Sequence, residues 1–475
     1  MAEFTPTKLI FASRSPEKDF ISNPSTDDVD RIFSSHSLPA EMEETIFHHL
    51  DIGSLRAARG TSRQIRGLIQ REGFARGYAD LHHTTEDLLD AFRLNEIAIA
   101  KEILHKYSRD IDINRCLLVA VKTNKVRSVE LLLDAGASFV VHDFVYDFDD
   151  ESDDESYIEP VVEVVHVIEI AAERGFIEIV RLLLERGAED LDEAFQMAVT
   201  NNHSEIARLL INAGADITVD DFACVCEASY RNNPEMMKIL LAAGASPDAQ
   251  DGDALIVAAD RGYTEIVKLL VYAGANVNIQ GGILLLYAAR SGHVEIVRIL
   301  LEFSANVHAN GDGALVVASR NGYVNIVEML LRFGADVNAQ EGEALVLASS
   351  NNRVSVVKKL IRNGADVHAR NDRALMTAVE LNLLDVVEVL LEFGADVHAD
   401  DDAALLMAVE RGNAHLVRML LSYGANAGAR NGEALMIASQ RNYSDIKELI
   451  ATSLRRISKQ FKRPSAKHSG YSRRQ

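Results

Sequence analysis

The chain contains 475 residues, of which 48% are hydrophobic and 25% are charged, and its formal net charge at pH 7 is −22. This length exceeds what one compact core supports, but a stack of repeats escapes that limit because each unit packs only on its neighbours. No apolar run approaches the roughly 20 residues of a membrane-spanning helix, and an acidic chain is poorly suited to nucleic-acid backbones, so we expect a soluble protein with protein partners.

Residues 1–37 show no sustained hydrophobic period, and we expect them to form a disordered leader. The apolar run Leu9–Ala12 is shorter than the hydrophobic region of a signal peptide, which argues against export. Three cysteines lie within helical patterns and do not suggest a disulfide framework: Cys116, Cys224 and Cys226. We therefore expect the protein in the cytoplasm or the nucleus, or in a host cytoplasm if its origin is viral or microbial.

Residues 38–83 are predicted to form a small helical domain. Pro39 suits the first turn of a helix, because the N–H that proline lacks would have no partner there. Met42, Ile46 and Phe47 follow at a spacing that places apolar side chains on one helix face. Two or three short helices should follow one another in this region.

The run from Leu38 to Ile69 resembles the F-box, the short helical domain that docks on a Skp1-type linker in cullin-based ubiquitin ligases. The resemblance rests on an opening Leu-Pro-x-Glu, an Ile-Phe pair before His-Leu-Asp, and a closing Ser-Arg-x-Ile-Arg. It departs at Ser62 and Ile65, where the family often has Cys and Trp or Phe. The resemblance implies that the linker contacts Leu38, Pro39, Glu41, Ile46, Phe47, Leu50 and Leu55. The alternative is that these helices only cap the repeats that follow.

Two degenerate repeats are predicted in residues 84–142, followed by an acidic insertion in residues 143–160. The second repeat is the clearer one, with Leu117 and Asn124 in register before Gly136. The insertion holds nine Asp or Glu residues but lacks the central glycine and the terminal glutamate of a calcium-binding loop. We predict a solvated, disordered loop without a metal ion.

Six consecutive blocks of 30 residues between Asp251 and Arg430 repeat one pattern of two short helices and two tight turns. Apolar residues recur at helical spacing, as in Leu255 and Ala258 followed by Val267 and Leu270. The turn between the two helices holds only Gly or Asn, which tolerate the left-handed backbone that ends a helix. These turn residues are Asn95, Asn124, Gly175, Asn202, Asn232, Gly262, Gly292, Gly322, Asn352, Asn382, Gly412 and Asn442.

These units resemble ankyrin repeats, as the segment Gly322–Asn338 shows most clearly. The resemblance spans about Thr85–Ile450 and implies an all-α solenoid, with repeats three to twelve in residues 161–453. The blocks are shorter than the family's repeat of about 33 residues, and we expect the loss in the β-hairpin fingers. The family's Thr-Pro-Leu-His helix start is also absent, and we expect nearby acids to cap the helices instead: Asp253, Asp312, Asp372 and Asp402.

Residues 454–475 are predicted to form a basic, disordered tail behind a closing cap. Lys447 stands where other blocks have a buried valine, as suits a face that no further repeat covers. Eight Lys or Arg and no acid lie between Ser453 and Gln475. A nuclear address or a contact with acidic lipids is the alternative to a solvated tail.

The sequence contains no phosphate-binding glycine loop, zinc-protease motif or nucleophile elbow, so we predict a protein that is not an enzyme. Cys224-Val-Cys226 lacks the second cysteine pair of a zinc site, and we expect neither a metal ion nor a cofactor. Four histidines occupy positions where other blocks have Tyr, Asn or Asp, and we interpret them as exposed repeat variation: His293, His308, His368 and His398.

Two residues before each turn escape the apolar pattern, and in the ankyrin family this position faces the concave groove. The candidate target-binding residues are Asp260, Arg261, Arg290, Arg320, Glu380, Glu410 and Arg411. Two functional hypotheses follow. In the first, a monomeric adaptor recruits an unknown target to a Skp1-cullin-F-box ubiquitin ligase. In the second, the chain is a non-catalytic ankyrin scaffold or host-interaction effector without a link to ubiquitin.

Overall fold

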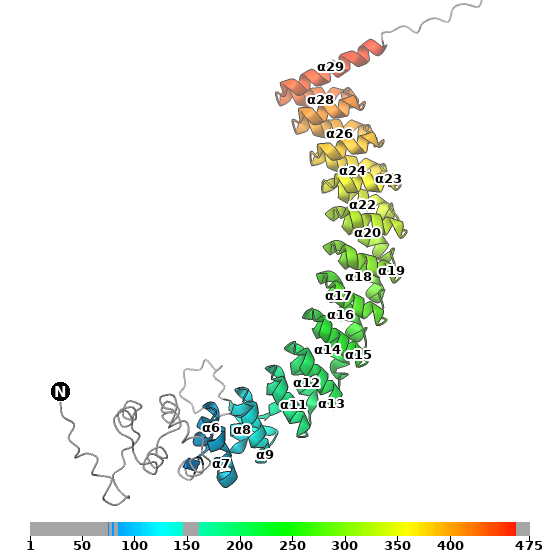
Figure 1. Cartoon of the computed structure of the whole chain (residues 1–475). Coiled ribbons are helices and arrows are strands. Elements are labelled where there is room, and N and C mark those ends of the chain that lie inside the picture. The colour runs from blue at the N-terminus through cyan, green and yellow to red at the C-terminus, as the bar shows by residue number, and fades with distance from the viewer. Residues whose placement is uncertain (1–74, 76–77, 80–83, 146–160, 462–475) are drawn as a thin grey trace, which may run out of the picture. The chain divides into compact units, whose positions relative to one another are not determined.

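The computed structural model describes residues 75, 78–79, 84–145 and 161–461, shown in colour in Figure 1. The described part divides into two units, one ending at Ile217 and the other beginning at Thr218. The F-box-like run lies outside the described residues. Ala75, Tyr78 and Ala79 are helical and buried, so a helical segment does precede the repeats.

The first unit consists of paired helices and one β-hairpin. Its elements are α6 (Thr85–Arg93), α7 (Ile97–Tyr107), α8 (Ile113–Lys122), α9 (Val126–Asp134), β1 (Val140–Val145), β2 (Val161–His166), α10 (Val167–Glu173), α11 (Ile177–Glu185), α12 (Leu191–Thr200) and α13 (Ser204–Ala213). Helices α8 and α10 pack side by side, as do α9 and α11. The predicted first two repeats are therefore helix pairs.

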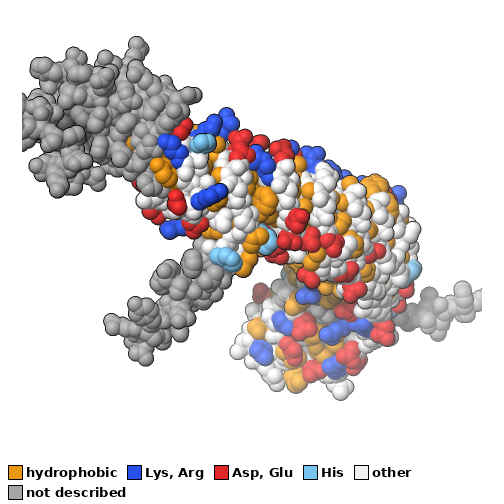
Figure 2. All heavy atoms as spheres, turned by 90° about the horizontal axis from the view of Figure 1, so that it is seen from below, with side chains coloured by type: hydrophobic (Ala, Val, Ile, Leu, Met, Phe, Trp, Pro, Cys, Tyr) orange, Lys and Arg blue, Asp and Glu red, His pale blue; other side chains and the backbone are white. Residues whose placement is uncertain are grey.

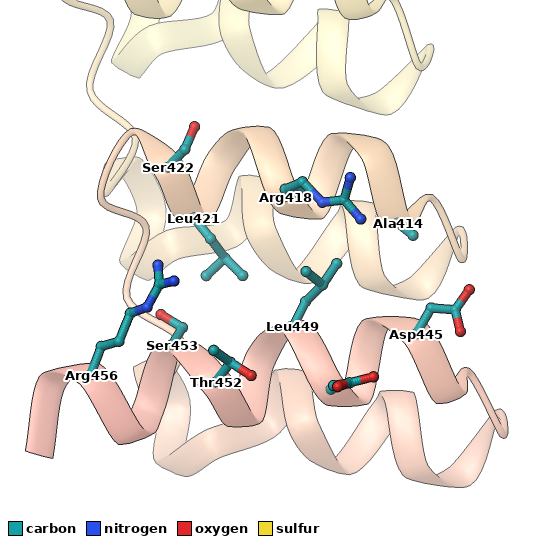
Figure 3. A pocket seen from close by; sticks show the side chains of 10 residues that line it. Ala414, Arg418, Leu421, Ser422, Asp445, Leu449, Thr452, Ser453 and Arg456 are labelled. Atoms are coloured by element: carbon teal, nitrogen blue, oxygen red, sulfur yellow. The ribbon is translucent and has the colours of Figure 1, made fainter.

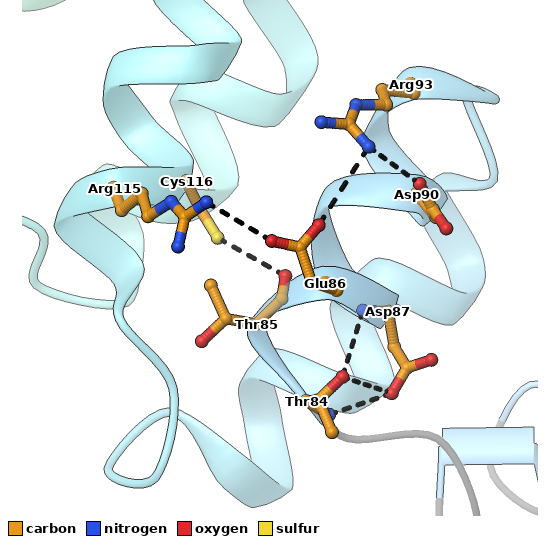
Figure 4. A network of polar contacts seen from close by, with 8 residues as sticks. All are labelled: Thr84, Thr85, Glu86, Asp87, Asp90, Arg93, Arg115 and Cys116. Atoms are coloured by element: carbon orange, nitrogen blue, oxygen red, sulfur yellow. Dashed lines mark hydrogen bonds and ion pairs between the residues drawn. The ribbon is translucent and has the colours of Figure 1, made fainter. Parts of the chain in front are cut away.

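Helix α6 begins with a reciprocal cap (Figure 4). The Thr84 hydroxyl accepts the N–H of Asp87 at 3.2 Å, and the Asp87 carboxylate accepts the N–H of Thr84 at 3.0 Å. Such a cap satisfies N–H groups that the helix itself cannot and stabilises it by about 1 kcal/mol. The carboxylate of Glu86 then joins α6 to α8 through Arg115, at 3.3 Å.

The β-hairpin is a departure from the predicted domain boundaries. Strands β1 and β2 pair antiparallel, with Val140 opposite His166 and Val145 opposite Val161. Three residues assigned to the disordered insertion, 143–145, therefore belong to β1, and β2 takes residues assigned to a helical repeat. Both strands are rich in valine, which favours extended backbone because of its branched β-carbon. Residues 146–160 lie outside the described residues.

The second unit repeats the helix pair eight times. Its elements are α14 (Val219–Tyr230), α15 (Pro234–Ala242), α16 (Ala249–Arg261), α17 (Thr264–Tyr272), α18 (Ile279–Ser291), α19 (Val294–Glu302), α20 (Ala309–Asn321), α21 (Val324–Arg332), α22 (Ala339–Ser350), α23 (Val354–Arg362), α24 (Ala369–Glu380), α25 (Leu384–Glu392), α26 (Ala399–Glu410), α27 (Ala414–Ser422), α28 (Ala429–Gln440) and α29 (Ser444–Phe461). The even-numbered first helices pack on one another in one layer, and the odd-numbered second helices form a second layer. No strand occurs among the described residues of this unit.

The core lies between the two layers and continues from repeat to repeat. Leu255 and Ala258 of α16, and Val267 and Leu270 of α17, are fully buried. Equivalent residues in later repeats, such as Leu330, are equally buried. The buried stripes predicted from helical spacing are thus confirmed.

All twelve predicted turn residues adopt positive φ, from 50° at Asn232 to 88° at Gly322. Several of the glycines are also needed for space. A β-carbon on Gly292 would lie 2.7 Å from the Tyr323 ring, and one on Gly322 would lie 2.7 Å from Cδ of Arg353. The sequence predicted that backbone geometry alone selects Gly or Asn at these turns. At these glycines, a side chain of the next repeat also occupies the space that a β-carbon would need.

The β-hairpin fingers expected of a full-length repeat are replaced by a one-turn left-handed segment. In α20, Asn310, Gly311 and Asp312 have φ between 54° and 63°, and each first helix from α14 to α28 has three equivalent residues. Left-handed backbone is unfavourable for residues with a β-carbon, so the tertiary packing must stabilise it. The prediction of shortened fingers with retained helix pairs is confirmed for the second unit.

The acids expected to cap the first helices do something different. Asp312 Oδ1 accepts the backbone N–H of Asp336 at 2.9 Å, and Asp372 and Asp402 accept from Asp396 and Asn426 at 2.7 Å. These carboxylates therefore join successive loops rather than cap their own helices. Asp253 instead hydrogen-bonds the Tyr230 side chain, which together with the nearby charge raises the tyrosine pKa.

The array ends in an extended helix rather than directly in a tail. Helix α29 continues to Phe461, so the predicted boundary at residue 454 falls within it. Lys447 is exposed while Ile446 and Ile450 are buried, as expected of a closing face. Within the described ranges, no helix combines the length and apolar character needed to span a membrane.

Candidate functional site

The predicted groove residues form a row at the C-terminal ends of the first helices. Asp260 and Arg261 end α16, and Arg290 and Arg320 lie in the last turns of α18 and α20. Glu380 ends α24, Glu410 ends α26, and Arg411 is the residue that follows α26. Most of these side chains are exposed, and Asp260 is partly exposed. Because first helices pack side by side, equivalent positions on neighbouring helices face the same side of the second unit.

Contacts along this row join neighbouring repeats only. The Arg290 guanidinium lies 2.8 Å from the Asp260 carboxylate, and Arg411 lies 3.8 Å from Glu380. Arg261 reaches back to the Tyr230 ring, with its guanidinium carbon 5.3 Å from the ring centroid. The structure thus joins four of the seven predicted residues in two local pairs, and it does not gather all seven into one site.

A double row of apolar side chains beside the charged row was missed by the sequence reasoning. These residues lie three or four positions before the two residues that precede each turn, which places them on the same helix face. They are Ile256, Val257, Leu286, Tyr287, Val316, Val317, Val346, Leu347, Met376, Leu406, Met407, Met436 and Ile437. Most are partly buried, and Met436 is 54% exposed. The sequence does contain a signal for this row, because each first helix has more apolar residues than are needed to form its buried stripe.

On the face drawn in Figure 2, apolar and charged side chains alternate rather than separating into large fields. Figure 2 shows apolar side chains interspersed with acidic and basic ones on the face in view. On the first helices, Arg290 lies over the Tyr287 ring at 4.7 Å from its centroid, so the two rows are in contact there. Such a mixture of aromatic, aliphatic and arginine side chains is typical of protein-binding surfaces.

The histidines interpreted as exposed variation have defined structural partners. Nδ1 of His308, His368 and His398 lies 3.1 to 3.2 Å from the carboxylates of Asp312, Asp372 and Asp402. These aspartate side chains are only 5 to 7% exposed, whereas the rings are more than half exposed. His293 packs over Gly262, with Nε2 3.0 Å from the Asp260 carbonyl oxygen. The rings of His308, His368 and His398 are thus exposed as predicted, and the structure adds that all four histidines also contact neighbouring polar groups of the repeats.

An open groove of about 600 Å³ lies between α27 and α29 (Figure 3). Arg418 and Leu421 line it from α27, and Leu449 and Arg456 line it from α29. Asp445 and Glu448 add negative charge, so the groove carries both signs of charge. No constellation of nucleophile, base and oxyanion donor is present among these lining residues.

The cysteines and acidic residues of the described part show no metal or redox site. No group of three or more potential metal ligands occurs among the described residues. All three thiols are free and buried, and burial raises their pKa to about 12 at Cys116 and about 11 at Cys224 and Cys226. Thiols of such high pKa are weak nucleophiles at neutral pH.

A family model described as ankyrin repeats, in sets of three copies, matches five overlapping segments of the chain: residues 166–221, 222–281, 255–341, 340–401 and 375–460. Together these cover more than half of its length. The chain belongs to the ankyrin-repeat family. This ankyrin array is a stack of paired helices, and membership of the family indicates a protein-interaction module.

The family match leaves the N-terminal part unassigned. It begins at residue 166, so the helix pairs of residues 84–142 are supported by the structure and not by the comparison. No family match covers the F-box-like run, and no curated protein matches the chain. The F-box resemblance therefore stays a prediction, and the ankyrin array is the established part.

Proposed function

We propose that the chain is a recruiting adaptor with two binding regions. The ankyrin array holds a target protein on its first-helix surface, and the F-box-like run Leu38–Ile69 docks a Skp1-type linker of a ubiquitin ligase. The observation that supports target binding is the pairing of an apolar row with a charged row along successive first helices. The ligase half of the proposal rests on sequence resemblance alone.

The proposed mechanism is proximity. A target held on the array would present its lysines close to a ubiquitin carrier delivered by the linker, which converts a bimolecular encounter into a local one. Such a role requires the adaptor to make no covalent bond. Within the second unit each repeat packs on the next, so a target bound there would lie on a stiff surface.

The docking half can be tested by changing Leu38 and Pro39 to Ala together in the full chain. We expect the double variant to lose co-purification with a recombinant Skp1-type linker while keeping its helical circular dichroism. Leu38 and Pro39 open the F-box-like run, which precedes the repeats in the sequence, so the array should fold unchanged. A matched control changes Leu9 to Ala in the leader. Undiminished co-purification of the double variant would end the ligase proposal.

The alternative function is a plain ankyrin scaffold whose N-terminal helices only cap the array. One observation favours it: Tyr78 is among the largest fully buried side chains, so part of the segment before the repeats is packed rather than solvated. Removing residues 1–69 keeps Tyr78 and separates the two functions. The adaptor should lose linker binding and melt almost as before, whereas a scaffold that needs its cap should melt at a lower temperature and retain its target.

A further inference from the structure

Basic and neutral polar side chains alone occupy one stretch of the charged row in this acidic protein. Between Arg290 and Arg353, the positions before and after each turn hold Ser, Asn, Arg, His or Tyr and no acid: Ser291, His293, Arg320, Asn321, Tyr323, Ser350 and Asn351. The acids of the neighbouring α22 lie at its opposite end, where Glu341 and Glu343 pair with Arg370. The C-terminal ends of α18, α20 and α22 therefore form a local basic edge.

The arginines of this edge differ in whether an acidic side chain pairs with them. Arg290 pairs with Asp260, whose side chain is 41% exposed. Arg353 uses its Nε–H on the backbone carbonyl of Arg320, at 3.2 Å, and pairs with no described acid. Arg320 is exposed, and within the described ranges no acidic side chain is within ion-pair distance of its guanidinium. This edge can accept at least one carboxylate without displacing an existing ion pair.

The apolar row runs beside this basic edge. Tyr287, Val317 and Leu347 occupy equivalent positions on α18, α20 and α22, and all three are partly exposed. The Tyr287 ring also supports the Arg290 guanidinium. A ligand that crosses the three helices would therefore meet aliphatic and aromatic surface on one side and guanidinium groups on the other.

From this arrangement we propose that the α18–α22 patch binds an extended segment of the target that carries two acidic residues flanking an apolar one. The patch comprises Tyr287, Arg290, Val317, Arg320, Leu347 and Arg353. The proposal rests on the proposed function, because it names the chemistry of the segment that the array recruits. One carboxylate pairs with Arg320, and the other shares the Arg290 guanidinium with Asp260. The apolar side chain packs on Tyr287 and Val317.

The spacing of the helices sets the spacing of the acids. Packed helices lie about 8 to 10 Å apart, and an extended chain advances about 3.3 Å per residue. Two carboxylates three residues apart therefore match two arginines on neighbouring first helices. A guanidinium binds a carboxylate through two parallel hydrogen bonds, which a lysine cannot do, so the arginines favour acids at this spacing.

Selection of peptides from a random displayed library against the immobilised full chain tests the proposal. The expected peptides carry two acids three residues apart with an aliphatic or aromatic residue between them. Affinity of a synthetic copy should fall at least tenfold when Arg290→Glu and Arg320→Glu are combined. The matched control combines Arg332→Glu on α21 with Arg362→Glu on α23, which makes the same total charge change at exposed positions outside the patch, and it should alter affinity less than twofold.

A second variant separates failure of this inference from failure of the proposed function. Val317→Asp places a charge in the apolar row, and circular dichroism checks that the array stays folded. If the selected peptides lack acids and lose binding only with Val317→Asp, the array recruits protein segments but the acidic motif is wrong. If neither variant affects the selected peptides, or no peptide is enriched, the patch and the first-helix surface both fail as a binding site.

Discussion

Two kinds of repeat interface in the second unit satisfy the same backbone N–H group with different residues. In one kind, the residue before the first helix is the acceptor: Asp248, Asn278 and Asn338 accept the N–H groups of Asn276, Asn306 and Asp366 at 2.7 to 2.8 Å. In the other, histidine takes that position, and an aspartate four residues later becomes the acceptor: Asp312, Asp372 and Asp402.

The choice of acceptor position correlates with the residue type at the third left-handed position of the turn. Where the first kind of acceptor is used, the third left-handed residue is glycine, as at Gly282 and Gly342. Where the second kind is used, that residue is the buried aspartate, and the histidine pairs with its carboxylate. Each interface needs one acceptor for the loop N–H group, and either of two positions can supply it. The residue before the first helix and the third left-handed residue must therefore change together.

The largest expected effect concerns the core, which both kinds of interface share. Leu330→Ala in a His-Asp repeat and Leu360→Ala in an Asn-Gly repeat should each lower the free energy of unfolding by about 2 to 5 kcal/mol. Both side chains are fully buried, and their removal leaves a cavity. Urea denaturation measures both. A cost below about 1 kcal/mol for either one would show that its helix face is misassigned.

The acceptors themselves should differ in cost. Asp372→Ala removes a carboxylate that is 5% exposed and leaves a loop N–H without its partner, so we expect a loss of about 1 to 3 kcal/mol. Asn338→Ala removes an exposed acceptor and should cost less. Urea denaturation of the two single variants compares them, and equal losses would contradict the proposed role of burial.

Converting one kind of interface into the other sharpens this comparison. Combining His368→Asn with Asp372→Gly recreates the pattern of residues 338 and 342, and it should recover most of the stability lost in Asp372→Ala. The reverse change is less favourable, because a β-carbon on Gly342 would lie 2.8 Å from that of Ala369. Thermal denaturation of the unaltered protein, the two single variants His368→Asn and Asp372→Gly, and the double variant measures the coupling between the two positions. Strict additivity of the single changes would contradict the coupling.

Glycines at the two turns of a repeat should also differ. Gly334→Ala meets no atom within 4 Å and should cost only the left-handed conformation, about 1 to 2 kcal/mol. Gly322→Ala adds a contact of 2.7 Å with Arg353 Cδ and should cost more. Combining Gly322→Ala with Arg353→Ala removes that contact. If Gly322→Ala still lowers the stability more than Gly334→Ala does in the Arg353→Ala background, then the contact with Arg353 is not the cause of the larger loss.

The smallest expected effect is at the exposed ion pairs of the charged row. Arg290→Ala breaks the pair with Asp260, yet both side chains are about half exposed, so the stability should change by less than about 1 kcal/mol. Arg411→Ala should behave alike. Calorimetric melting of the two variants provides the check. A large loss at Arg290 would mean that this residue serves the fold and is a poor probe of binding.

Much of the array could be predicted because its signals are local. Gly262 and Asn352 differ in chemistry but share tolerance of left-handed backbone, so the turn register could be read from the chain. The roles of His308 and Asp312 could not, because the N–H group that they serve belongs to Asp336 in a later loop. The hairpin of β1 and β2 was missed because its valines were read as part of a repeat and of an acidic loop.

The sequence by itself determined the helix pairs, their period, the buried stripes and the short loops, since each depends on spacing and backbone preference within about one repeat. Only the tertiary structure decided which polar groups meet across repeats, and that Tyr287, Val317 and Leu347 lie side by side on neighbouring first helices. Those features arise between residues about thirty positions apart. Their contacts are created by stacking and leave no local periodicity.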